Sequence, residues 1–182
     1  MQTVTTIAEL RLALGKARET EKRVGFVPAM GYLYDGHLAL VEASQQRNDI
    51  TVVSIYVNPT QFGPKEDLNT YPRDFPGDEK LCRNAGVAIL FAPDSREIYP
   101  NRFDTFIEPG ELAKPLCGAF RPGHFRGVAT VVCKLFNIVQ PVLFSSGKRI
   151  FSNARSCGKW LLTELSGRDR YSADGSGARR TR

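Results

Sequence analysis

Short apolar runs rich in β-branched residues alternate along the chain with segments of mixed polarity. Residues 24–28, 50–57 and 87–92 form three such runs, and each is closed by a proline at or just beyond its end. A continuous apolar run of this length is typical of a strand buried on both faces of a sheet. Residues 103–108 predict a short fourth strand.

The segments between these runs show helical periodicity. Apolar residues recur every three or four positions from Ile7 to Ala17, behind two capping threonines. We expect helices over residues 7–21, from His37 onward, over residues 78–85 and over residues 128–139. Strands that alternate with helices predict an α/β fold, with a parallel sheet and helices on both faces.

Two loops leave predicted strands at the same edge of this sheet. Residues 30–37 follow the first apolar run, and residues 58–63 follow the second. Ligands of parallel α/β sheets bind beyond the carboxyl ends of the strands. We therefore expect a binding site between these two loops.

The first loop lies in the segment PAMGYLYDGH, which ends at His37. Backbone N–H groups at a helix start attract anions, and Gly31 and Gly36 permit close approach of the backbone, so the loop is a candidate phosphate cradle. His37 would donate a further hydrogen bond to the phosphate. The alternative is an ordinary strand–turn–helix corner with a capping histidine, and the local spacing leaves both open.

The second loop contains the sequence VNPTQFGP. Asn58 and Gln61 carry amides directly after a strand, and an amide both donates and accepts hydrogen bonds. Such a pair suits a small substrate that carries a hydroxyl and a carboxylate. An Asx-Pro turn with solvent-facing amides is the alternative.

A third segment, RPGHFRGV, precedes the last predicted helix. Arg121 and Arg126 lie beside the start of that helix, where they would suit an anionic ligand. A surface turn with solvated arginines is the alternative.

The net charge of +6 comes entirely from residues 142–182, which hold nine Lys/Arg and three Asp/Glu. A neutral body with a basic tail does not match a nucleic-acid-binding domain, so we expect no nucleic-acid partner; DNA binding by the tail alone is the alternative. No apolar run is long enough to predict a membrane span. The chain has two histidines, and its four cysteines lack C-x-x-C spacing, so we expect no metal site. No signal-peptide pattern is present, and the scattered cysteines are typical of reduced thiols, so we expect the protein in the cytoplasm.

Together the motifs MGYLxDGH, VNPTQFGP and RPGHFRGVATVV resemble the signatures of the pantothenate synthetase family, in the family's order. The resemblance covers about residues 1–141. It implies a Rossmann-like nucleotide-binding domain of the nucleotidyltransferase superfamily over residues 1–141, with a HIGH-type ATP loop. Residues 142–182 then form a basic tail outside the family pattern, expected to be partly disordered, and the family's C-terminal domain is missing.

The resemblance also implies site residues. His37 is expected to be the catalytic residue that contacts the nucleotide phosphates, and Gln61 is expected to hold pantoate and then β-alanine. The ATP-binding loop is expected to comprise Met30, Gly31, Tyr32, Leu33, Tyr34, Asp35, Gly36 and His37.

The implied reaction has two steps and uses ATP with Mg²⁺. The pantoate carboxylate attacks the α-phosphate, which gives pantoyl adenylate and pyrophosphate. The β-alanine amine then displaces AMP to give pantothenate. The family resemblance further implies a homodimer.

The chain departs from the family pattern in its ATP loop and in its tail. Ala29 and Tyr34 stand where the family has threonine and the first histidine of its motif. Tyr34 can donate a hydrogen bond, but it cannot carry a positive charge. After Pro141 the chain lacks the family segment that supplies a phosphate-binding lysine and a second pantoate-binding glutamine, so Lys148 is not assigned the lysine's role.

A shifted reading frame offers an explanation for the tail. Suitable codons for residues 146–154, read from the third base of each triplet, encode the expected family segment. The hypothesis is a frameshift near residue 141, which the coding DNA tests directly. We then expect little or no synthetase activity, and the alternative function is a catalytically inactive nucleotide-binding or dimerising remnant.

Overall fold

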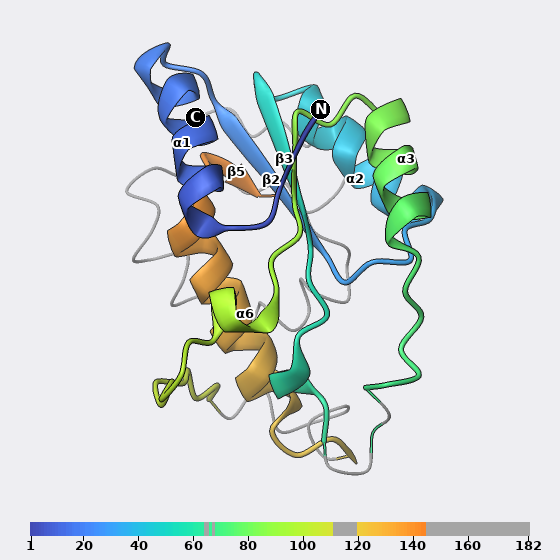
Figure 1. Cartoon of the computed structure of the whole chain (residues 1–182), viewed down its shortest axis with the longest axis vertical. Coiled ribbons are helices and arrows are strands. Elements are labelled where there is room, and N and C mark those ends of the chain that lie inside the picture. Colours follow the sequence, from blue (N-terminus) through green and yellow to red (C-terminus); the bar gives the residue numbers. More distant parts are fainter. Residues whose placement is uncertain (64–65, 67, 111–119, 145–182) are drawn as a thin grey trace, which may run out of the picture.

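The computed structural model in Figure 1 describes residues 1–63, 66, 68–110 and 120–144. Its strands form one sheet in the order β1-β4-β3-β2-β5, and every neighbouring pair is parallel. The strands are β1 (Gln2–Val4), β2 (Val24–Ala29), β3 (Ile50–Ile55), β4 (Ile89–Phe91) and β5 (Leu143–Phe144). The helices are α1 (Ile7–Glu19), α2 (Asp35–Gln45), α3 (Phe75–Asn84), α4 (Ser95–Ile98) and α6 (His124–Val139), with a 3₁₀ helix η1 (Pro59–Gln61).

Helices cover both faces of the sheet, as predicted. Figure 1 shows α1 and α6 on one side of the strands and α2 and α3 on the other. Consecutive strand residues point to opposite faces. Phe26 and Val52 therefore join the larger core cluster with α1 and α6, whereas Val27 and Val53 join a smaller cluster with α2 and α3. Burial on both faces explains why the central strands are continuous apolar runs.

Three helices begin earlier than the apolar periodicity predicted. The second helix begins at Asp35, with Tyr34 as its N-cap, rather than at His37. The third begins at Phe75, because the Asp74 side chain accepts a hydrogen bond from Gly77 N–H and caps the first turn. The fourth, α6, begins at His124 directly after Gly123, whose φ is 83°. Of these three starts, that of α3 has a side-chain cap, whereas among the described residues the N-caps Tyr34 and Gly123 make no side-chain capping hydrogen bond.

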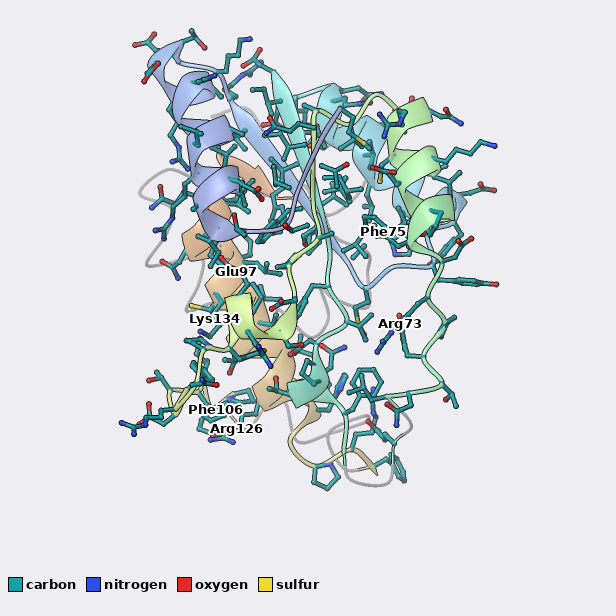
Figure 2. All side chains as sticks on the ribbon, viewed as in Figure 1. Arg73, Phe75, Glu97, Phe106, Arg126 and Lys134 are labelled. Atoms are coloured by element: carbon teal, nitrogen blue, oxygen red, sulfur yellow. The ribbon has the colours of Figure 1, made fainter. Side chains whose placement is uncertain are left out.

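The predicted strand at residues 103–108 is wrong. The segment has no regular structure, because its groups bind α6 instead of a neighbouring strand. The N–H of Ile107 donates to Thr130 Oγ1 at 3.0 Å, and the guanidinium of Arg126 lies 3.8 Å from the centre of the Phe106 ring (Figure 2). Aromatic residues here form cation–π contacts rather than a sheet ladder.

The two outer strands, β1 and β5, were not predicted. Strand β5 pairs with Gly25 and Phe26 of β2, so at Pro28 the strand β2 pairs only with β3 among the described residues. That arrangement accommodates a proline, which has no N–H to donate to a second neighbour. The predicted boundary after residue 141 falls just before β5, and the remainder of the predicted tail lies outside the described residues.

Among the described helices, none has the length and apolar character needed to cross a membrane.

Candidate active site

The two loops predicted to form a site meet at the carboxyl ends of β2 and β3. Met30 follows β2, Gln61 ends η1 after β3, and the Gln61 Nε2 donates to the Met30 sulfur at 2.7 Å. Both residues line a cavity of about 320 Å³. The expected cleft between the two loops is therefore present.

The cavity has a polar side and an apolar side. Gln61, Arg121 and His124 supply polar groups, and Tyr56 and Tyr71 supply aromatic rings. The apolar side comes from the face of α6 that turns toward the strands: Val128, Val131, Val132 and Leu135. This lining suits a small ligand with a branched hydrocarbon part and a few polar groups.

Asn58 holds the Gln61 amide in place. Its Nδ2 donates to Gln61 Oε1 at 3.2 Å and to the Gly127 carbonyl at 3.1 Å. Its Oδ1 accepts hydrogen bonds from the Thr60 N–H, the Thr60 hydroxyl and the Tyr99 hydroxyl. The Asn58 side chain is buried and its hydrogen-bonding capacity is fully used. Asn58 therefore orients Gln61. It also forms the turn of the alternative prediction, through Oδ1 and the Thr60 N–H, but its amide is buried rather than solvent-facing.

A glycine allows α6 to pack directly against η1. A Cβ atom placed on Gly127 would lie 2.3 Å from the Thr60 carbonyl oxygen, well inside contact distance. Only glycine therefore permits the close approach that brings the apolar face of α6 to Gln61.

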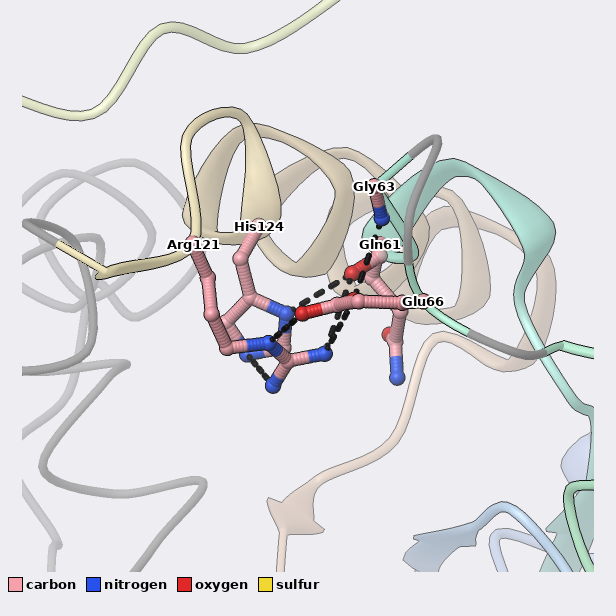
Figure 3. Close-up of polar contacts among 5 residues, drawn as sticks. All are labelled: Gln61, Gly63, Glu66, Arg121 and His124. Atoms are coloured by element: carbon pink, nitrogen blue, oxygen red, sulfur yellow. Dashed lines mark hydrogen bonds and ion pairs between the residues drawn. The ribbon is translucent and has the colours of Figure 1, made fainter.

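A network of charged groups joins the end of η1 to the start of α6 (Figure 3). Arg121 forms an ion pair with Glu66, whose other contact is the Gly63 N–H at 3.0 Å. His124 Nδ1 donates to the Gln61 carbonyl at 2.9 Å, and Arg121 donates to His124 Nε2 at 3.3 Å. The imidazole of His124 is thus neutral, with its proton on Nδ1.

The same network sets the pKa values of its members. Hydrogen bonds from the Arg121 guanidinium, and next from the Gly63 N–H, lower the pKa of Glu66 to about 2. Burial is the main cause of the lowered pKa of His124, which favours its neutral form. The predicted anion-binding arginines are both engaged within the chain, Arg121 with Glu66 and Arg126 with Glu108.

The expected phosphate loop makes a turn through left-handed backbone. Gly31 has φ of 90° and Tyr32 has φ of 53°. The N–H groups of Tyr32 and Leu33 both donate to the carboxylate of Asp78 in α3. The N–H groups of Asp35 and Gly36, which open α2, make no hydrogen bond within the described part of the chain.

His37 lies in the first turn of α2 and is not among the residues that line the cavity. Its Nδ1 accepts a hydrogen bond from the Tyr34 N–H at 3.4 Å, so the proton of the neutral ring is on Nε2. The Tyr34 ring packs against it edge-on, with 4.5 Å between the centroids. Burial lowers the pKa of His37, and the charge of Asp78 acts in the opposite direction.

Sequence reasoning missed several groups that shape the site. The sequence pattern places Asp78 only in a helix, although it anchors the first loop from 45 residues away. The motif that contains His124 indicates no role for it, and the spacing of the α6 valines predicts a packed core. A helical apolar stripe on α6 was the available signal for the cavity wall, but it does not distinguish a wall from a packed core.

Within the described ranges, no group of three or more His, Cys, Asp or Glu side chains is placed to hold a metal ion.

A parallel sheet with a cleft at its carboxyl edge, flanked by a helix N-terminus, defines an α/β protein of the nucleotidyltransferase-like class. Comparison with known proteins gives the family. The family model for Pantoate-beta-alanine ligase matches residues 2–155, so the chain belongs to the pantoate–β-alanine ligase family. The resemblance and the fold inferred from the sequence are both confirmed.

Individual relatives agree with this assignment. Pantothenate synthetase 1 of Bradyrhizobium diazoefficiens is 68% identical over 151 residues, which are 83% of this chain and 53% of the relative. The enzyme of Thermotoga neapolitana is 55% identical over 141 residues, 78% of this chain and 50% of the relative. The chain thus spans about half the length of these relatives.

Solved structures of the family share the fold of this chain. The pantothenate synthetase of Thermus thermophilus has a TM-score of 0.83 and 47% identity, over 90% of this chain and 58% of that one. The ligase of Francisella tularensis, complexed with β-γ ATP and β-alanine, has the same TM-score at 34% identity, over 90% of this chain and 62% of that one.

Proposed function

We propose that this chain carries the substrate-binding face of an enzyme that condenses pantoate with β-alanine, with ATP converted to AMP and pyrophosphate through a pantoyl-adenylate intermediate. The observation that carries the proposal is the contact between the Met30 loop and Gln61 at one edge of the sheet. It supports a pocket for a small hydroxy acid between the two loops, and the helix start proposed for phosphate follows Met30 in the chain.

Gln61 is the proposed binding group for pantoate and then for β-alanine. Its Nε2 now donates to a thioether sulfur, which is a weak acceptor. A carboxylate or hydroxyl oxygen of a substrate accepts more strongly, so exchanging the sulfur for the ligand is favourable. The apolar side of the cavity formed by α6 covers the methyl-bearing part of pantoate.

The start of α2 is the proposed site for the ATP phosphates. The N–H groups of Asp35 and Gly36 are without partners among the described residues, and the helix dipole favours negative charge there. His37 holds a proton on Nε2 and is proposed to donate it as a hydrogen bond to the phosphate as charge develops. Tyr34, which packs against His37, keeps the ring oriented.

The chemistry requires positioning more than reactive side chains. The substrate carboxylate is the nucleophile on the α-phosphorus, and the β-alanine amine is the nucleophile on the resulting acyl group. Gln61 holds the acid, and His37 stabilises charge on the phosphate. Removal of one such donor lowers the rate by about 10²–10³. Mg²⁺ enters as the counter-ion of ATP, bound mainly by phosphate oxygens with few protein ligands.

Further proposals concern the assembly and its location. The family resemblance supports a homodimer. Free thiols at Cys82 and Cys133 suit the reducing conditions of the cytoplasm. Because the chain departs from the family pattern at Tyr34 and after Pro141, we expect it to bind substrates but to form little or no pantothenate.

Calorimetry and a pyrophosphate assay on the full chain test the proposal. We expect the chain to bind pantoate and Mg·ATP. The variant Gln61→Leu should bind pantoate at least about tenfold more weakly, and His37→Gln should bind ATP more weakly. The matched control is Gln46→Leu, an exposed residue at the end of α2, which should bind both like the unaltered chain.

Equal pantoate affinity in Gln61→Leu and Gln46→Leu would contradict the assignment. ATP binding without pyrophosphate release selects the catalytically inactive nucleotide-binding form of the proposal. Pantothenate formed at the rate of a full-length synthetase would instead refute the expected loss of activity.

A further inference from the structure

Asp78 occupies the turn that the sequence offered to phosphate. Its Oδ2 accepts from the Tyr32 N–H at 2.9 Å, and its Oδ1 accepts from the Leu33 N–H at 2.7 Å. Asp78 is 3% exposed, and both hydrogen bonds are partly buried. Each carboxylate oxygen thus holds one of two successive backbone donors, across two elements far apart in the sequence.

The backbone of the loop requires such an anchor. Gly31 and Tyr32 both have positive φ, and a non-glycine residue there is strained by about 1 kcal/mol or more. Successive N–H groups in such a turn converge on one point and bind an anion. Hydrogen bonds to a charged acceptor stabilise the turn, and here the anion is the protein's own carboxylate.

Asp78 lies near the N-terminus of a helix and close to other titratable groups. It lies in the first turn of α3, where the helix dipole stabilises negative charge. Among the described residues, its negative charge acts to raise the pKa of His37 on α2, of Tyr71 before α3 and of Cys82 on α3. Burial lowers the pKa of His37, and the charge of this carboxylate opposes that shift.

We propose that Asp78 is a positioning residue for the nucleotide site, which locks the Tyr32 and Leu33 N–H groups away from the ligand and leaves the α2 start as the phosphate donor. The inference rests on the proposed function. A phosphate cannot replace the buried carboxylate without leaving Asp78 unpaired. In the part of the chain that the structure describes, the N–H groups of Asp35 and Gly36 and the Nε2–H of His37 remain free to bind a phosphate.

The first test uses the full, unaltered chain labelled with ¹⁵N and titrated with Mg·ATP. The amide signals of Asp35 and Gly36 should shift on binding. Those of Tyr32 and Leu33 should stay near their unbound positions and remain protected from solvent exchange. Large shifts at Tyr32 and Leu33, with lost protection and none at the α2 start, overturn the inference.

The second test compares Asp78→Asn with Asp74→Asn. Asp74 is an exposed N-cap of the same helix that bonds Gly77 and touches neither loop residue. Asp78→Asn should weaken ATP binding about tenfold, lower the pKa of His37 by removing a nearby negative charge, and leave pantoate affinity unchanged. Asp74→Asn should change none of the three.

A folded Asp78→Asn chain with the ATP affinity and His37 titration of the unaltered chain overturns the inference. If this variant does not fold, the titration of the unaltered chain decides. Failure of the unaltered chain to bind ATP refutes the proposed function instead. In that case, protection of the Tyr32 and Leu33 amides from solvent exchange still tests whether Asp78 holds these two N–H groups.

Discussion

Replacement of Asn58 by aspartate tests how the Gln61 amide is held. Asn58→Asp keeps the shape of the side chain and the Oδ1 acceptor, but it exchanges the NH₂ donor for oxygen. The Gln61 Oε1 and the Gly127 carbonyl then lose their donor and face a second oxygen. Because each buried acceptor left unpaired costs about 1–3 kcal/mol, the free energy of unfolding should fall by about 2–6 kcal/mol at neutral pH.

The loss should depend on pH in a defined direction. Burial among acceptors favours the protonated acid, so the pKa of the introduced carboxyl is raised in the folded state above about 3.9, its unfolded value. Between these two pKa values the folded state binds more protons, and stability therefore falls as pH rises. The protonated acid also supplies one O–H donor, which restores one of the two lost bonds.

Urea denaturation followed by circular dichroism at pH 5 and pH 8 measures both effects. The control is Asn101→Asp, at an exposed turn position, which should change stability by less than about 0.5 kcal/mol. The reasoning is refuted if Asn58→Asp is no less stable than the control, or if its loss is the same at both pH values.

Three other predictions use the same chain. Glu66→Gln should lower the free energy of unfolding near pH 7. The difference from the unaltered chain should vanish as pH falls from about 4.5 through about 2, because the depressed pKa of Glu66 contributes stability only while the carboxylate is charged. Urea denaturation across this pH range measures the difference. Gly127→Ala should destabilise the fold by about 1–3 kcal/mol through a clash with the η1 carbonyl, whereas Gly15→Ala, in a helix with open space around it, should stabilise it by about 0.5–1 kcal/mol. Titration of the imidazole ¹³C signals should give His37 and His124 pKa values below 6.5, and a midpoint above that value for either ring would contradict the burial argument.

The central sheet followed from the sequence because burial on both faces leaves a continuous apolar run. The edge strand β1 has only Val4 buried, so its composition carries no such signal. Residues 103–108 have the aromatic content of a strand, but their partners are Arg126 and Lys134 on α6. Local composition does not reveal which element supplies the partners of an aromatic segment.

The site was predictable only where strand order dictated it. The meeting of Met30 and Gln61 follows from two loops that leave neighbouring parallel strands at one edge. Asp78 and His124 contribute through contacts between elements far apart in the sequence, and no periodicity or local motif encodes such a contact. The phosphate cradle stays a prediction, and the sequence did not reveal that Asp78 accepts hydrogen bonds from two of its N–H groups.

The sheet divides the interior into two cores of unequal size. The proposed phosphate donors lie on α2, which packs on the smaller core. The proposed pantoate-binding wall lies on α6, which packs on the larger one. Layers with fewer apolar contacts open at lower free energy. A nucleotide bound at the start of α2, and only while that layer is folded, would therefore raise the free energy of opening most in the less stable layer.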